Sequence, residues 1–193
     1  MKVRIAIFAS GSGTNAENII RYFRESSIIE TVLVLSDKRD AYVLERANGL
    51  HVPSVVFSKA EMETTDSVLK VLSEYKADFI VLAGFLLRIP ENMLRAYPGR
   101  IVNIHPALLP RYGGKGMYGS KVHEAVVAAG EKESGITIHY INEHYDEGAV
   151  IFQAKCPVLP ADSPDDLAKK VHALEYACYP RVIEQIIVRS FGL

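Results

Sequence analysis

The stretch VRIAIFASGSGTNAENIIRYFR, from Val3 to Arg24, decides the fold. It starts with an apolar run that ends at Ala9 in a glycine-rich turn, which indicates a buried strand. From Thr14 onward, apolar residues recur at helical spacing. A strand, a glycine turn and a helix in this order are typical of the first unit of a parallel sheet with helical crossovers.

The same alternation continues along the chain. It changes beyond residue 110, where a glycine-rich loop, RYGGKGMYG (111–119), precedes a helix, two strands joined by a polar turn, and a long helix with a capped start. The pattern predicts an α/β fold: a doubly wound, mostly parallel, Rossmann-like sheet with helices on both faces, in one domain over residues 1–193. Expected strands cover 3–9, 32–35, 54–57, 79–83, 101–104, 135–141 and 150–154, and expected helices 14–24, 42–47, 65–75, 91–96, 122–129 and 163–187.

Composition limits the function classes. The 193 residues carry 22 Lys and Arg against 23 Asp and Glu, a formal net charge of −1, so no broad cationic field exists to hold a nucleic-acid backbone. No apolar run approaches the ~18 residues of a membrane span, and the first residues lead into a strand instead of a signal peptide. Two cysteines, Cys156 and Cys178, are too few for a disulfide framework. We therefore expect a cytoplasmic protein that binds neither nucleic acid nor membrane.

The turn SGSGTNA, from Ser10 to Ala16, allows three interpretations. Glycines let the backbone turn sharply, and the N-terminus of the following helix offers unpaired N–H groups, so the phosphate of a mononucleotide would fit there. The string also satisfies the dinucleotide pattern G-x-G-x-x-A, and Asp37 lies about where a ribose-binding acid belongs, which favours an NAD-type protein. The third interpretation is a plain strand-to-helix turn in which Ser or Thr caps the helix.

Two polar side chains end the fifth expected strand. Asn103 and His105 are two residues apart, so they point to the same face at the carboxyl end of the strand, where ligands of open α/β sheets bind. One interpretation is that both side chains offer hydrogen bonds to a ligand in the crevice. The other is that they lie in the core and satisfy each other's hydrogen bonds. Asp146 lies in the acidic turn between the two late strands, where Glu143 and Glu147 are its rivals for an inward-facing carboxylate.

Four segments carry a family resemblance: GSGTN (11–15), LAGFLLRI (82–89), NIHPALLP (103–110) and ITIHYINEHYDEGAVI (136–151). With these segments in order, from about Val3 to Ile187, the chain resembles the folate-dependent formyltransferases, in particular those that act on glycinamide ribonucleotide. The resemblance implies transfer of a formyl group from 10-formyltetrahydrofolate, as co-substrate, to the amine of 5'-phosphoribosylglycinamide in de novo purine (IMP) biosynthesis. It also implies a nucleotide-binding half over about 1–100 and a folate and catalytic half over about 101–193.

The resemblance further implies roles for residues at matching positions, and it implies no metal ion. The catalytic trio would be Asn103, His105 and Asp146. The ribonucleotide would be bound by Gly13, Thr14, Asn15 and Glu175. The folate would be bound by Leu86, Leu87, Arg88, Ile89, Asn103 and Lys59.

The chemistry agrees with the trio. The amine attacks the formyl carbon and an oxyanion develops, which needs hydrogen-bond donors; the Asn103 amide and a protonated His105 supply two. A carboxylate at Asp146 would raise the pKa of His105 above its usual ~6.5 and help to move the proton of the amine. The resemblance also suggests a cis Leu109–Pro110 bond.

Some positions depart from the family pattern. The loop from Arg111 to His123 is longer and richer in glycine, Arg88 falls one place later than the arginine of the family, and His172 stands where glutamine is more common. We expect His139 to be a structural strand residue, and His123 to be either a surface residue or a neighbour of the loop. The alternative functions are another folate-dependent formyltransferase or hydrolase, or an NAD-type nucleotide-binding protein. Either a monomer or a homodimer is expected.

Overall fold

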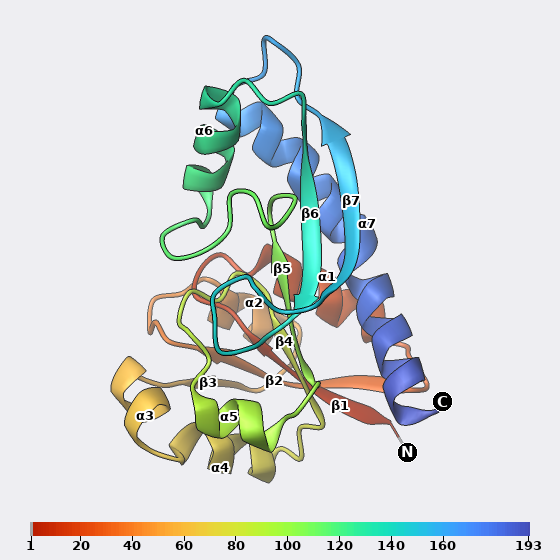
Figure 1. The fold of residues 1–193 in the computed structure, drawn as a ribbon. Helices are drawn as coiled ribbons and strands as arrows, with labels where there is room; N and C mark the ends of the chain where they lie inside the picture. The colour runs from red at the N-terminus through yellow and green to blue at the C-terminus, as the bar shows by residue number, and fades with distance from the viewer. Residues whose placement is uncertain (1) are drawn as a thin grey trace.

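The computed structural model describes residues 2–193 and contains one seven-stranded sheet in the order β3-β2-β1-β4-β5-β6-β7 (Figure 1). The first five strands run parallel, whereas β6 and β7 continue the sheet in antiparallel fashion. The strands are β1 (Val3–Phe8), β2 (Ile29–Ser36), β3 (Ser54–Val56), β4 (Phe79–Leu82), β5 (Ile101–His105), β6 (Glu133–Tyr140) and β7 (Val150–Pro157).

Helices cover both faces of this sheet (Figure 1). One face packs against the first, second, sixth and seventh helices, and the other packs against the third, fourth and fifth. The helices are α1 (Thr14–Phe23), α2 (Val43–Gly49), α3 (Lys59–Thr64), α4 (Ser67–Glu74), α5 (Glu91–Ala96), α6 (Ser120–Ala128) and α7 (Pro164–Phe191).

The two cores follow from the alternation of side chains along β1. Ile5 and Ile7 belong to the core under α1 and α7, whereas Ala6 and Phe8 belong to the core over α3, α4 and α5. All four are fully buried, as expected for a central parallel strand that is covered on both faces. The strand order reverses between β1 and β4, and at such a reversal a crevice opens beyond the carboxyl ends of the strands.

Helix α7 crosses the junction between the parallel and antiparallel parts of the sheet. A capping box between Ser163 and Asp166 starts it, and it packs along α1, α6, β6 and β7 (Figure 1). The hydroxyl of the fully buried Tyr179 donates to the carbonyl of Leu82 at 2.8 Å, and it also lies 3.3 Å from the carbonyl of Val102. Leu82 ends β4, and Val102 lies within β5. The helix is therefore tied to the strands that carry the crevice.

The predicted fold class is confirmed, and each expected strand and helix corresponds to an element of the structure. The pattern misses α3, although Ser58 and Glu61 form a capping box that marks its start in the sequence. Helix α7 runs to Phe191, beyond the expected end at residue 187. The Leu109–Pro110 bond is cis, as the resemblance suggested.

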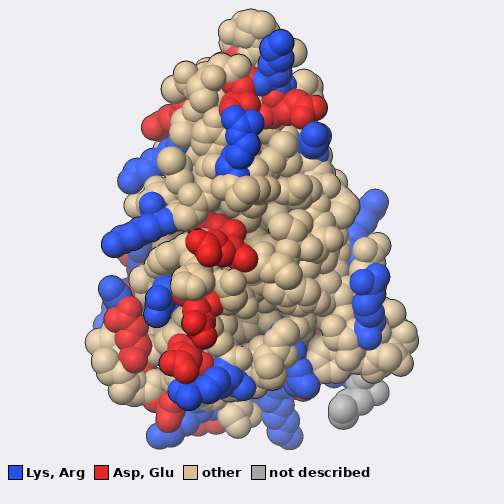
Figure 2. Space-filling model, in the orientation of Figure 1, with Lys and Arg blue, Asp and Glu red and all other residues tan. Residues whose placement is uncertain are grey.

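Charged side chains of both signs are mixed on the face of the molecule drawn in Figure 2. Figure 2 shows Lys and Arg side chains interspersed with Asp and Glu over this face instead of gathered in one patch. Within residues 2–193, no helix has the length and apolar character needed to cross a membrane.

Candidate active site

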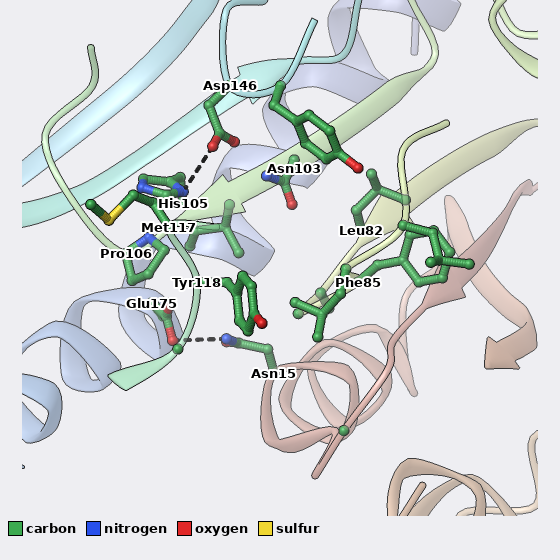
Figure 3. A pocket seen from close by; sticks show the side chains of 18 of the residues that line it. Asn15, Leu82, Phe85, Asn103, His105, Pro106, Met117, Tyr118, Asp146 and Glu175 are labelled. Carbon is green, nitrogen blue, oxygen red and sulfur yellow. Dashed lines mark hydrogen bonds and ion pairs between the residues drawn. The ribbon is translucent and has the colours of Figure 1, made fainter. Parts of the chain in front are cut away.

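A cavity of about 760 Å³ lies at the carboxyl ends of β1, β4 and β5 (Figure 3). Segments far apart in the sequence line it: residues 11–15, 82–89, 103–106 and 114–120, together with the β6–β7 turn, α6 and α7. Every residue predicted for the site lines this cavity except Lys59. The fold thus brings together the predicted ribonucleotide, folate and catalytic residues.

The glycine turn leaves the start of α1 open. Gly13 is the N-cap residue of α1 at φ 73°, a left-handed conformation that glycine adopts readily, and no side chain caps the helix. A Cβ at Gly13 would lie 2.3 Å from Cγ2 of Val43, so no larger residue fits without displacing α2. The interpretation as a turn capped by Ser or Thr is therefore wrong. Uncapped N–H groups at a helix N-terminus are suited to an anion.

Asp37 does not line the cavity. Its Oδ1 accepts a hydrogen bond of 2.5 Å from the hydroxyl of Ser10, whose oxygen in turn accepts from the backbone N–H of Leu86 at 3.1 Å. Asp37 therefore fixes the glycine turn against the 82–89 segment instead of facing a ligand. This arrangement goes against the NAD-type interpretation, which needs that carboxylate on a ribose.

His105 is buried at the end of β5 between two oxygen atoms. Its Nε2 lies 2.7 Å from the carbonyl oxygen of Tyr112, and its Nδ1 lies 3.5 Å from Oδ2 of Asp146 (Figure 3). A carbonyl oxygen can only accept, so Nε2 carries a hydrogen and Nδ1 is the nitrogen left to face the carboxylate. Glu143 and Glu147, the rivals of Asp146, are both exposed.

The predicted pKa of His105 is wrong in its net direction. Burial, the largest influence, lowers the pKa of His105, and the opposing effects of Asp146 and of the Tyr112 carbonyl do not outweigh it. For Asp146, burial would raise the pKa, but contacts with His139, with His105 and with the backbone N–H of Gly114 outweigh it and lower the pKa. The pair therefore favours a neutral imidazole beside an ionised carboxylate.

His139 belongs to the same cluster, although the sequence suggested only a structural role. It is fully buried on β6, directly opposite Asn103 in the antiparallel pairing with β5. Its Nδ1 donates to the carbonyl of Tyr140 (2.9 Å), and its Nε2 accepts from the Asn103 amide at 3.2 Å. The same Nε2 lies 3.6 Å from Oδ1 of Asp146. His139 thus orients the Asn103 side chain.

A second polar cluster occupies the other end of the cavity. Oε2 of the buried Glu175 accepts from Nδ2 of Asn15 at 2.9 Å (Figure 3). The same Oε2 pairs with Nδ1 of His172 at 2.8 Å. The hydrogen bond to Glu175 raises the pKa of His172. His123 is buried here as well, with its ring centroid 6.4 Å from that of His172, so a surface position for His123 is wrong.

The folate-side residues divide between the cavity and the surface. Leu86, Leu87, Arg88 and Ile89 line the cavity, with Leu86 and Arg88 exposed at its edge. Lys59 starts α3, and its Nζ pairs with Glu63 at 3.6 Å, away from the lining residues. Among residues 2–193, no three His, Cys, Asp or Glu side chains are arranged to hold a metal ion.

Relatives of known sequence share most of this chain. The family described as formyl transferase matches residues 3–183. Phosphoribosylglycinamide formyltransferase of Haemophilus influenzae is 36% identical over 94% of this chain and 85% of its own length. The chloroplastic phosphoribosylglycinamide formyltransferase of Arabidopsis thaliana is 41% identical over 95% of this chain. The chain spans only 65% of that relative and 60% of the one from Vigna unguiculata.

Solved structures agree with these sequences. Glycinamide ribonucleotide transformylase 1 of Geobacillus kaustophilus superposes with a TM-score of 0.87 at 35% identity, over 97% of this chain and all of the other. Phosphoribosylglycinamide formyltransferase of Streptococcus pneumoniae has a TM-score of 0.84 at 38% identity, over 96% of this chain and 99% of the other. On sequence and on structure alike, the chain belongs to the formyl transferase family.

Proposed function

We propose that this protein transfers a formyl group from 10-formyltetrahydrofolate to the amine of 5'-phosphoribosylglycinamide, a step of purine biosynthesis. The observation that carries the proposal is the meeting of Asn103, His105 and Asp146 in one cavity with the uncapped N-terminus of α1. Relatives that bear the corresponding name at 36% and 41% identity support the choice of substrates.

The ribonucleotide fits the end of the cavity that holds the glycine turn. The backbone N–H groups of Gly13, Thr14 and Asn15 would receive its phosphate, because the helix N-terminus combines unpaired donors with a positive dipole end. Glu175, already held by Asn15 and His172, would accept hydrogen bonds from the ribose hydroxyls. A carboxylate that is fixed in advance loses little entropy when the sugar binds.

The folate fits the wall formed by residues 86–89. Its pterin would bind to backbone groups of Leu86 to Ile89, and the apolar side chains there would cover its ring. The exposed Arg88 is the cation of this wall that could meet a carboxylate of the folate tail. Lys59 could contribute only at the outer end of the tail, because it lies off the cavity.

The trio would then carry the proton and the developing charge. The amine nitrogen bonds to the formyl carbon, and Nδ1 of neutral His105 takes a proton from that nitrogen while Asp146 stabilises the imidazolium. One Asn103 amide hydrogen is held by His139, and the other is free to donate to the oxyanion. When the bond from carbon to N10 breaks, the imidazolium returns its proton to N10, so the folate leaves as tetrahydrofolate.

The test is a transfer assay with glycinamide ribonucleotide and 10-formyltetrahydrofolate, followed by the change in folate absorbance. We expect Asn103→Ala and His105→Ala each to lower kcat by about 10²–10³, and Asn48→Ala, on the exposed face of α2, to change nothing. Near-normal turnover in either site variant contradicts the roles proposed here. Release of formate without formylated ribonucleotide would identify a hydrolase instead.

A further inference from the structure

The segment Arg111–Gly114 touches both members of the His105–Asp146 pair through its backbone. The carbonyl of Tyr112 accepts from Nε2 of His105 at 2.7 Å, and the N–H of Gly114 donates to Oδ2 of Asp146 at 2.9 Å. The hydrogen bond made by one nitrogen of an imidazole decides which nitrogen is protonated. The position of the Tyr112 carbonyl therefore decides which nitrogen of His105 faces Asp146.

The backbone of this segment does not adopt its conformation without support. Tyr112 has φ 58°, in the left-handed region that costs an ordinary residue about 1 kcal/mol or more. A Cβ at the next residue, Gly113, would lie 2.5 Å from Cδ2 of Leu109 and 3.2 Å from Cβ of Asp146, so a larger residue there would have to displace the Leu109 side chain. Something outside the segment has to hold Tyr112 in place.

Glu131 supplies that support from the turn that follows α6. Its Oε1 accepts the hydroxyl hydrogen of Tyr112 at 2.7 Å, and its Oε2 accepts from Nη1 of Arg111 at 3.0 Å. Nη2 of Arg111 also donates to Oε1, so the guanidinium binds the carboxylate in a bidentate manner. One largely buried carboxylate thus anchors two consecutive side chains of the segment, and it lies outside the cavity.

We propose that Glu131 is a positioning residue for the reaction: through the Tyr112 hydroxyl it holds the Tyr112 carbonyl on Nε2 of His105, which leaves Nδ1 as the nitrogen that exchanges its proton beside Asp146. The inference rests on the proposed function only for the part that Nδ1 plays in turnover. The tautomer itself is a property of the protein alone and can be observed without either substrate.

Tyr112→Phe and Glu131→Ala release the anchor from its two sides, and Glu133→Ala is the matched control. Glu133 also forms an ion pair, with Lys155 at 2.9 Å, but on β6 and β7, where neither partner contacts the segment. Release of the anchor should lower kcat by up to about 10- to 100-fold, the factor by which loss of a hydrogen bond to a charged group shifts an equilibrium. The KM values of both substrates should stay within about twofold, because the anchor touches neither binding end.

Nitrogen-15 NMR of the histidine-labelled full chain at neutral pH gives the direct readout. We expect a protonated-type shift for Nε2 and an unprotonated-type shift for Nδ1 of His105 in the unmodified protein and in Glu133→Ala. In Tyr112→Phe and Glu131→Ala the two shifts should move toward each other, since the tautomers then mix.

Two results would overturn the proposal. A protonated-type Nδ1 in the unmodified protein refutes the tautomer, and unchanged His105 shifts in both anchor variants refute the role of Glu131, even if their kcat falls through a loss of stability. The proposed function fails separately, if the unmodified protein shows the expected tautomer but does not formylate glycinamide ribonucleotide.

Discussion

Replacing Gly13 by alanine probes how the glycine turn presents the N-terminus of α1. Gly11→Ala is the matched control from the same turn, since a Cβ at Gly11 has no atom within 4 Å. At Gly13 the same methyl group meets both a left-handed backbone conformation, φ 73°, that is unfavourable for alanine, and the first residue of α2. The two variants therefore differ in geometry and not in chemistry.

The size of the effect follows from the contacts. Alanine in a left-handed conformation costs about 1–2 kcal/mol. The new Cβ would lie 2.3 Å from Cγ2, 2.4 Å from Cβ and 2.7 Å from Cα of Val43, whose N–H donates to the carbonyl of Gly11 at 3.1 Å. Because backbone as well as side chain is in the way, overpacking adds about 1–3 kcal/mol. The sum, about 2–5 kcal/mol, corresponds to a fall in Tm of about 4–20 °C for a chain of this size.

Calorimetry and steady-state kinetics measure the two consequences. We expect Gly13→Ala to melt well below the unmodified protein and to show a KM for the ribonucleotide raised about tenfold or more, because a displaced N–H loses its hydrogen bond to phosphate. The KM for the folate should hardly change, and Gly11→Ala should melt like the unmodified protein because its methyl group meets no clash. Equal behaviour of the two variants would refute the steric argument, and a lower Tm with an unchanged ribonucleotide KM would refute phosphate binding at this turn.

Two further predictions concern charge. In Asp146→Asn we expect a lower kcat at neutral pH, and we expect the acidic limb of the pH–rate profile to move to lower pH. The reason is that the carboxylate, which raises the pKa of His105, is gone. An acidic limb that does not move would mean that Asp146 has no effect on the pKa of His105. His172→Gln keeps a hydrogen-bond donor for Glu175 but removes the positive charge of the imidazolium. In the unmodified protein, the hydrogen bond to Glu175 raises the pKa of His172. Urea unfolding over a pH series should show the variant less stable than the unmodified protein below pH ~6.5, with the difference vanishing as pH rises through the raised pKa; a pH-independent difference would contradict the ion pair.

Local pattern was enough to predict every strand and every helix except α3, and it also predicted which way Asn103 and His105 point. Asn103 and His105 both line the cavity because two residues on one strand separated by one position share a face, a property that needs no knowledge of the fold. The spacing of the glycine turn allowed a mononucleotide phosphate site, a dinucleotide site or a capped turn, and the structure excludes only the capped turn. The sequence left the role of Asp37 open, because that role depends on a hydrogen bond from Ser10 that only the tertiary structure creates.

The parts that escaped prediction depend on packing between distant segments. His139 joins the site because strands β5 and β6 pair in a register that puts His139 opposite Asn103. The sequence does not reveal that register. The pKa of His105 was predicted with the wrong sign because burial, which outweighs the effect of Asp146, is a property of the whole fold. Lys59 was carried over from the resemblance, and the structure pairs it with Glu63 instead of bringing it to the cavity.

The contact between Asn15 and Glu175 also has a consequence for the time course of synthesis. Its two members are separated by 160 positions, so at about 5–20 residues per second the ribosome delivers the second member about 8–30 s after the first. Strand β5, which carries both Asn103 and His105, emerges earlier, and α7 arrives later and brings Glu175. The end of the cavity where we place the ribonucleotide is thus completed by the same helix that closes the core. We therefore expect a change that loosens α7 to weaken binding of the ribose before it disorders the sheet.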